Sequence, residues 1–169
     1  MHNKKYSWIK RALGLQKKHL KNLEILELDL LGENSENTLS EQLSDKPIDI
    51  FINNAGVGNS NQRFGVVSSQ PWVEVLKVNL IAPLTVTQSI IENIKKGSDK
   101  KIYFLSSQLG SIEDNTSGGM YIYRSSKIAL NQVVKFFISR FKTDGYNSYI
   151  TTSRMGEIRY GRNQCSSFN

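Results

Sequence analysis

Three short runs rich in apolar residues lie along the chain, and each is interrupted by polar residues or glycine near its end. They read LEILELDL (23–30), IDIFINNAG (48–56) and KIYFLSS (101–107). Runs of this length predict β-strands. The nearly continuous run at 48–56 is typical of a strand buried on both faces of a parallel sheet.

Three longer segments place apolar residues at helical spacing instead. They cover residues 8–20, 71–96 and 121–141, and the second opens with Pro71, which suits the first turn of a helix. The polar stretch 31–47 predicts a short helix and a turn. The expected apolar positions are Trp8, Ile9, Ala12, Leu13 and Leu20; Val75, Val78, Leu84, Ile90, Ile91 and Ile94; and Leu130, Val133, Val134, Phe137 and Ile138.

Strands that alternate with helices predict one α/β domain, with a parallel sheet covered by helices on both sides. In such sheets ligands bind beyond the carboxyl ends of the strands. Those ends are expected at Asp29, at 53–56 and at 106–107, where polar residues follow the apolar runs.

The net charge of +7 is concentrated at the two ends of the chain. Residues 1–22 carry +7 and residues 147–169 carry +2, which leaves −2 for residues 23–146. This distribution predicts a basic amphipathic helix over 1–22 rather than a nucleic-acid groove. No run is long enough to span a membrane, so we expect neither nucleic acid nor membrane as a partner.

The chain has few residues suited to metal or disulfide chemistry. Cys165 is the single cysteine, and His2 and His19 stand alone near the amino end. We therefore expect no disulfide, no metal site and a cytoplasmic location.

The candidate chemistry lies in the segment YIYRSSK (121–127), where Tyr123 stands four residues before Lys127. On a helix the two side chains share one face. A nearby ammonium favours the phenolate, so the pair could exchange a proton with a substrate. Ser107, at a strand end, could hydrogen-bond a carbonyl oxygen. Each feature alone is common by chance.

Together the motifs are specific. The order NNAG (53–56), VN (78–79), SSQLG (106–110) and YRSSK (123–127) resembles the short-chain dehydrogenase/reductase family. The string SSQLGSIEDNTSGGMYIYRSSKIALN is similar to its Sniffer/C-factor branch, which includes carbonyl reductases and a developmental signalling protein. The resemblance covers about residues 12–146. It implies a Rossmann-like doubly wound parallel sheet and NAD(P)H-dependent reduction of a small carbonyl substrate.

The resemblance also implies roles for individual residues. Tyr123 would be the general acid/base, and Lys127 would lower its pKa and hold the nicotinamide ribose. Ser107 would polarise the carbonyl, and Asn79 would anchor a water of the proton relay. Tyr121 has no such role. The residues expected to contact NADP or NAD are Asp29, Leu30, Asn54, Ala55, Gly56, Tyr123 and Lys127.

The front of the chain departs from the family. No strand with a Gly-rich turn precedes residue 23, so the predicted fold is an incomplete Rossmann-like domain over 23–146. The family's first strand is central, and its loss should leave the strand IDIFINN unpaired along one edge. The loss of the turn should weaken cofactor binding, and the choice between NAD and NADP stays open.

The back departs too. Residues 147–169 show neither strand nor helix periodicity and are predicted to be an aberrant tail. Allowed codons from Thr152, read one nucleotide later, spell the family's His-Pro-Gly-Trp segment, and the Trp is forced by Met155-Gly156. We therefore expect that a single-nucleotide shift near Tyr146–Asn147 has put the carboxyl end out of frame.

Three functions stay open at this point. The chain is a carbonyl reductase, a non-catalytic remnant, or a C-factor-like signalling or interaction protein. Homo-oligomers would form through helices 71–96 and 121–141.

Overall fold

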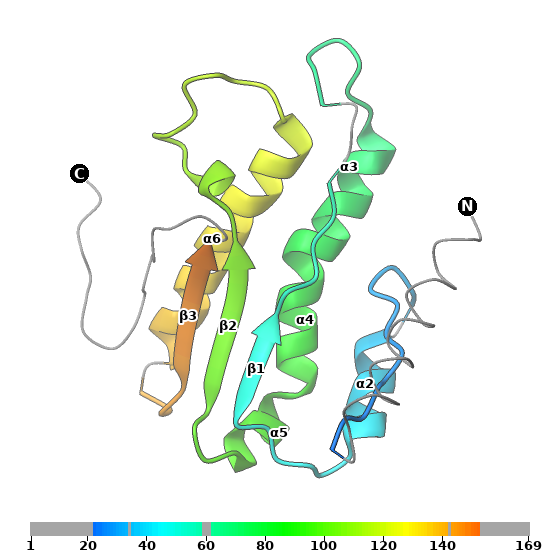
Figure 1. Ribbon diagram of the computed structural model, residues 1–169, viewed down its shortest axis with the longest axis vertical. Helices are drawn as coiled ribbons and strands as arrows, with labels where there is room; N and C mark the ends of the chain where they lie inside the picture. Colours follow the sequence, from blue (N-terminus) through cyan, green and yellow to red (C-terminus); the bar gives the residue numbers. More distant parts are fainter. Residues whose placement is uncertain (1–21, 34, 59–61, 142, 153–169) are drawn as a thin grey trace.

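The computed structural model describes residues 22–33, 35–58, 62–141 and 143–152 (Figure 1). Strands and helices alternate, as the sequence predicts. The helical segments 8–20 and the tail after Thr152 lie outside the described residues. In chain order the elements are α2 (Ser35–Leu43), β1 (Ile50–Asn53), α3 (Ser69–Leu76), the π-helix η1 (Lys77–Ile81), α4 (Ala82–Ser89), α5 (Ile91–Lys96), β2 (Lys101–Ser106), the 3₁₀-helix η2 (Gln108–Gly110), α6 (Tyr121–Phe141) and β3 (Asn147–Thr152).

The strands form one parallel sheet in the order β1–β2–β3. Ile50 of β1 pairs with Lys101 of β2, and Lys101 pairs on its other side with Asn147 of β3. Among the described residues β1 is therefore an edge strand. This confirms the expectation that the strand over 48–56 lacks a neighbour on one side.

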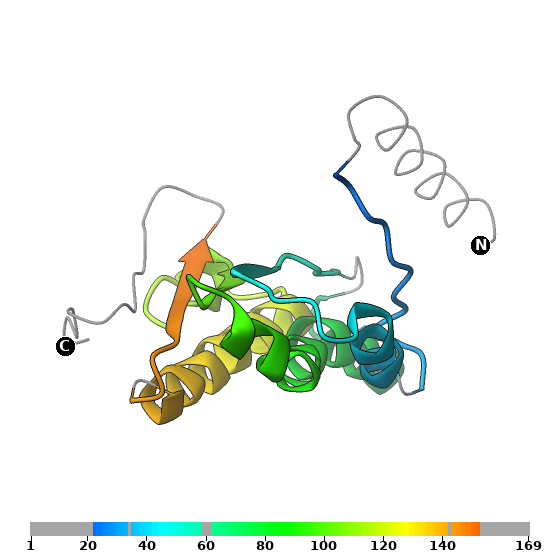
Figure 2. The ribbon, with the colours of Figure 1, turned by 90° about the horizontal axis from the view of Figure 1, so that it is seen from below.

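The described helices all lie on one face of the sheet (Figure 2). On that face Ile102 and Phe104 are buried, whereas Ile50 and Ile52 on the opposite face are 49% and 56% exposed. Among the described residues, helices cover only one face of the sheet, so covering of the second face stays a prediction. The apolar run indicates that both faces of β1 are apolar, whereas the described helices lie over only one of them.

Two strand predictions need correction. Residues 23–29 form no strand, because no described strand lies beside them to supply a hydrogen-bonded ladder. Residues 147–152, assigned to an aberrant tail, form β3 and pair with β2 along its whole length. The domain thus continues past Tyr146 to Thr152. The signal was present in the aromatic and β-branched run Tyr149–Thr152, which favours a strand.

The predicted helix 71–96 begins at Ser69, two residues before Pro71, and is not continuous. It passes through η1 and breaks at Ile90, whose φ of −109° and ψ of 11° are not helical. Pro83 accounts for the π-helical turn, because proline has no N–H to donate to the carbonyl four residues earlier, that of Asn79. The irregular turn therefore surrounds a predicted site residue.

Helix α6 has the predicted bounds and supplies much of the core. Its buried residues Leu130, Val134 and Phe137 pack toward β2 and β3, and the Phe137 and Phe104 rings meet edge-on at 6.0 Å. Val133 and Ile138, also expected on the buried face, are half-buried. None of the described helices is long and apolar enough to cross a membrane.

Candidate active site

The four predicted catalytic residues come from three elements that meet at the carboxyl end of β2. Ser107 directly follows that strand, Asn79 lies in η1, and Tyr123 and Lys127 lie in α6. A Cβ on Gly110 would lie 3.1 Å from the backbone carbon of Lys127. The turn after Ser107 therefore packs directly on α6, and a glycine permits that approach.

Lys127 is 3% exposed, and its Nζ donates a hydrogen bond of 2.9 Å to the carbonyl oxygen of Leu105. The same Nζ lies 5.8 Å from the centroid of the Tyr123 ring. Burial lowers the pKa of this ammonium from its ordinary value of 10.5. The helical spacing thus brings the cation beside the tyrosine ring, as predicted, and two of its three N–H donors are left for other acceptors.

Tyr123 is half-buried, and its position is fixed by a residue that the sequence did not point to. Gln62, which is 7% exposed, accepts a hydrogen bond of 2.9 Å from the Tyr123 amide through its Oε1. Gly58 lies beside the ring, because a Cβ on Gly58 would be 3.9 Å from Tyr123 Cδ2. Tyr121 is 42% exposed and faces the Phe64 ring at 6.5 Å, away from this arrangement.

Ser107 is the N-cap of η2, and its Oγ accepts a hydrogen bond of 3.2 Å from the Leu109 amide. Accepting this bond leaves the hydroxyl hydrogen free to be donated. A serine held in this way at a strand end can polarise a carbonyl oxygen, which is the role expected from the resemblance.

Asn79 is fully buried and its amide group is occupied by protein contacts. Its Oδ1 accepts from the Val57 amide at 2.8 Å, and its Nδ2 donates to the Val57 carbonyl at 2.9 Å and to Ser126 Oγ at 3.0 Å. Ser126 Oγ in turn donates to the Tyr123 carbonyl at 2.7 Å. The side chain therefore connects the loop after β1 to helix α6. The group of Asn79 that could anchor a water is its backbone carbonyl, because Pro83 has no N–H to donate to it.

The predicted cofactor loop Asn54–Ala55–Gly56 is exposed and lies beside these residues. A Cβ on Gly56 would lie 3.7 Å from both Asn79 Oδ1 and Lys127 Nζ. The start of the loop is held where Asn53 Nδ2 donates to Thr87 Oγ1 at 3.1 Å. Gly56 thus leaves an open surface next to the buried ammonium.

Asp29 and Leu30 are the residues predicted to flank an adenine ring. Asp29 lies in a turn, where its Oδ1 accepts from the Leu31 amide at 3.1 Å and its carbonyl accepts from the Gly32 amide at 2.9 Å.

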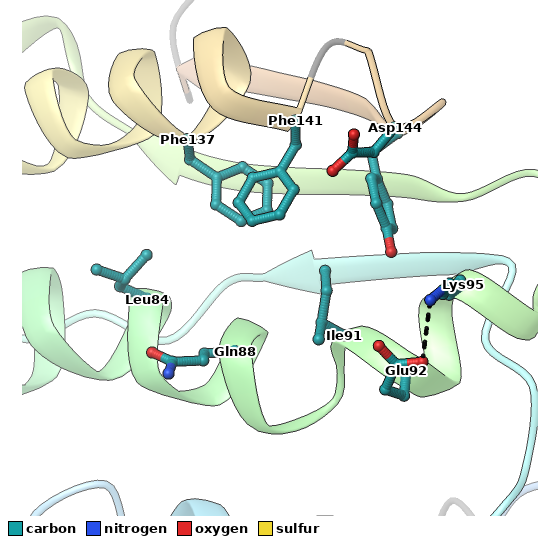
Figure 3. Close-up of a pocket in the computed structure, with 9 residues that line it drawn as sticks. Leu84, Gln88, Ile91, Glu92, Lys95, Phe137, Phe141 and Asp144 are labelled. Carbon is teal, nitrogen blue, oxygen red and sulfur yellow. Dashed lines mark ion pairs between the residues drawn. The ribbon is translucent and has the colours of Figure 1, made fainter.

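A cavity of about 420 Å³ lies elsewhere, between α4, α5 and the carboxyl-terminal half of α6 (Figure 3). Its walls include Leu84, Phe137 and Phe141, and the ion pair of Lys95 with Glu92 lies at its rim (Figure 3). None of the predicted site residues lines it. The chemistry-bearing residues and the cavity therefore belong to different ends of α6.

The parallel sheet with crossover helices, and a Tyr–Lys pair at the carboxyl end of its middle strand, define a Rossmann-like α/β protein. Residues 9–151 match the family described as short chain dehydrogenase. The chain belongs to this oxidoreductase family, which confirms the predicted family and the incomplete Rossmann-like fold class.

Relatives place the chain near the predicted branch. It is 33% identical over 100 residues to the C-signal of Myxococcus xanthus, covering 59% of this chain and 60% of that protein. Among solved structures it is similar to the carbonyl reductase Sniffer of D. melanogaster, with a TM-score of 0.76, 28% identity and coverage of 85% and 64% of the two chains. A carbonyl reductase of Pseudomonas aeruginosa PAO1 in complex with NADP gives a TM-score of 0.71 at 25% identity, covering 82% and 60%.

The chain spans about three-fifths of the length of these proteins. The share is smaller for some other relatives, such as the 1-hydroxy-2-glutathionyl-2-methyl-3-butene dehydrogenase of Rhodococcus, which is 31% identical over 120 residues and of which 52% is covered.

Proposed function

We propose that the chain carries the proton-transfer residues of an NAD(P)H-dependent carbonyl reductase. The observation that supports this most directly is the buried Lys127 ammonium beside Tyr123, next to the open surface at Gly56. The similarity to a carbonyl reductase in complex with NADP supports the cofactor class.

The residues present fit one end of such a cofactor. Lys127 has donors to spare beside Gly56 and would hold the ribose next to the nicotinamide. The pyrophosphate end has no Gly-rich turn among the described residues, and each missing charge-assisted contact costs about 1.5–3 kcal/mol of binding. We therefore expect NADP or NAD to bind weakly to this chain. When bound, the cofactor supplies the hydride.

The protein residues would supply the proton of the reaction and stabilise the charge that its transfer leaves behind. The Tyr123 hydroxyl would donate its hydrogen to the carbonyl oxygen of a small substrate as charge develops there. The Lys127 ammonium would stabilise the resulting phenolate electrostatically. Ser107 would donate a hydrogen bond to the same oxygen, and a water on the Asn79 carbonyl would return a proton to Tyr123.

The decisive variant is Tyr123→Phe, which removes one hydroxyl and keeps the ring. Loss of a general acid lowers the rate by about 10²–10⁴-fold, so we expect NADPH consumption with an aldehyde or ketone to fall to background. Tyr121→Phe is the matched control and should retain the rate of the unaltered chain. Equal rates for the unaltered chain and Tyr123→Phe would exclude the proposed acid.

A second function has its own support in the similarity to the C-signal of Myxococcus xanthus. In this alternative the chain acts as an interaction or signalling protein, and the Tyr–Lys pair is not used for turnover. An NADPH titration followed by cofactor fluorescence separates the two. Binding that Lys127→Met abolishes supports the reductase, and no binding up to millimolar NADPH favours the second function.

A further inference from the structure

The backbone amide of Tyr123 lies just before the point where helix α6 can bind its own N–H groups. The first N–H groups of any helix have no acceptor within that helix. In α6 the Arg124 amide already donates to the Met120 carbonyl, at 2.9 Å, so the Tyr123 amide is the last that lies before the helical hydrogen bonds. The proposed proton donor is thus carried by a residue whose N–H the helix itself does not bind.

The residues around the start of α6 offer this amide no cap. A helix usually begins with a Ser, Thr, Asp or Asn whose side-chain oxygen accepts from a first-turn N–H. The residue before α6 is Met120, which has a φ of 51° and no side-chain oxygen, and the first turn contains no acidic residue. The acceptor is instead Oε1 of Gln62, which comes from 61 residues earlier in the chain and lies 2.9 Å from the Tyr123 nitrogen.

The hydrogen bond between Tyr123 and Gln62 lies in surroundings that exclude most water. Gln62 is 7% exposed, and Ile122 and Arg124, on either side of Tyr123, are 0% and 7% exposed. An N–H that loses its partner in such surroundings is more unfavourable than one that faces water. Gly58, which also follows β1, lies against the tyrosine ring. The chain after β1 therefore contacts both the backbone and the ring of the proposed acid.

We propose that Gln62 is a positioning residue for the proton transfer, because it caps the first turn of α6 at Tyr123 and so fixes where the tyrosine hydroxyl lies. This inference rests on the proposed function. Without the cap the first turn would fray, and the hydroxyl would move relative to Lys127 and the substrate carbonyl. The expected cofactor contacts lie at Lys127 and Gly56, so loss of the cap should affect turnover far more than NADPH binding.

The kinetic test compares three variants, with benzaldehyde as the carbonyl probe. Gln62→Met keeps the length of the side chain and removes the acceptor, and misplacement of a reacting group by about 1 Å can lower a rate about 10²-fold. We expect a fall in kcat of that order, with an unchanged Kd for NADPH. Gln62→Glu keeps an acceptor oxygen at the positive end of the helix and should recover most of the rate. Asn93→Ala removes buried hydrogen bonds elsewhere and should keep kcat, which controls for a general loss of stability.

The contact itself is tested without turnover, by hydrogen exchange of the chain labelled with ¹⁵N-tyrosine. The Tyr123 signal is identified by its absence from Tyr123→Phe. Gln62→Met should speed exchange of the Tyr123 amide about tenfold, the equivalent of one lost hydrogen bond. The Tyr103 amide, in the middle of β2, is the internal control and should exchange at an unchanged rate.

Three results would overturn the role of Gln62. They are an unchanged kcat in Gln62→Met, a failure of Gln62→Glu to recover the rate, and unchanged exchange of the Tyr123 amide. If the unaltered chain shows no turnover, the proposed function itself fails, and amide exchange alone decides the inference. Faster exchange of the Tyr123 amide in Gln62→Met then still supports Gln62 as the residue that holds Tyr123, and unchanged exchange excludes it.

Discussion

Three buried polar side chains hold the candidate site together, and each does so through named hydrogen bonds. Asn79 hydrogen-bonds both backbone groups of Val57 and also the Ser126 hydroxyl. Ser126 in turn donates to the Tyr123 carbonyl. Lys127 is held by the Leu105 carbonyl. The loop after β1 and the tyrosine are therefore positioned by one network.

We expect Asn79→Ala to lower the free energy of unfolding by about 2–4 kcal/mol, because three hydrogen bonds are lost and buried partners are left unpaired. Asn93 offers a matched control, since its buried Nδ2 donates to the Ser44 and Lys46 carbonyls at 2.8 Å. Urea unfolding should show a comparable loss for Asn93→Ala. In NADPH titrations only the Asn79 substitution should weaken cofactor binding. Equal weakening by both substitutions would contradict a local role of Asn79 at the site.

Lys127 should make stability depend on pH in the alkaline range. Its folded pKa is lowered by burial, so between that pKa and 10.5 the unfolded chain binds more protons than the folded chain. The free energy of unfolding from this group therefore rises with pH in that window. Urea unfolding from pH 7 to 11 should show the rise, and Lys127→Met should remove it.

Tyr146 acts in the opposite direction and serves as the control. Burial, followed by the charge of Glu92, raises its pKa above 10.0. Above pH 10 the folded chain keeps a proton that the unfolded chain has lost, so stability from this group falls as pH rises. Tyr146→Phe should remove that fall and leave the Lys127 rise intact; loss of both would assign the slope to something else.

The sequence could predict those side chains whose spacing carries the information. Tyr123 and Lys127 lie one helical turn apart, and that spacing was sufficient to predict their contact. Gln62 and Arg124 could not be found in this way. Gln62 reaches Tyr123 from 61 residues earlier in the chain, and an arginine on a helix is ordinarily exposed, so neither has a local pattern.

At the scale of elements, local periodicity was enough for α6 and β2 but not for segments that need a distant neighbour. The apolar run 23–30 has the composition of a strand, yet a strand exists only where another chain segment pairs with it. Conversely, β3 forms because β2 offers a free edge of matching length. The interruption of the helix at η1 follows from Pro83, a residue that was visible in the sequence.

The turn after α5 should tolerate no side chain. A Cβ on Gly97 would overlap the backbone carbonyl of Ile48, just before β1. Because backbone cannot move aside cheaply, we expect Gly97→Ala to cost about 1–3 kcal/mol in urea unfolding. Gly56→Ala is the comparison, since its Cβ makes only ordinary contacts at 3.7 Å. It should keep stability within about 0.5 kcal/mol and weaken NADPH binding; the reverse pattern would contradict both assignments.

At the scale of the whole molecule, the helices among residues 22–152 that the structure describes cover one face of the sheet. Ile50 and Ile52 are exposed on a strand that is also an open edge, and exposed apolar edges favour association. The helical side carries its own exposed apolar residues, Ile81 and Phe136, at 50% and 64%. These lie in the segments through which the expected homo-oligomer would form.

Light scattering after size exclusion can separate the two surfaces. If the open sheet edge drives association, Ile52→Lys should lower the concentration-dependent mass and Phe136→Lys should not. If the helices drive it, the effects should be reversed. Ile112→Lys, in a loop where Ile112 is 74% exposed, is the control and should leave the mass unchanged.

The parallel pairing of the strands also affects how fast the chain can fold. Ile50 meets Lys101, 51 residues later, and Lys101 meets Asn147, 46 residues later. No hairpin joins the three described strands, so each of their pairings requires closure of a long loop before it gains any contact. We expect refolding to be slow for a chain of this size, with the apolar edge of β1 available to other chains throughout the delay. Dilution should then raise the refolding yield, because the competing association is bimolecular while loop closure is not.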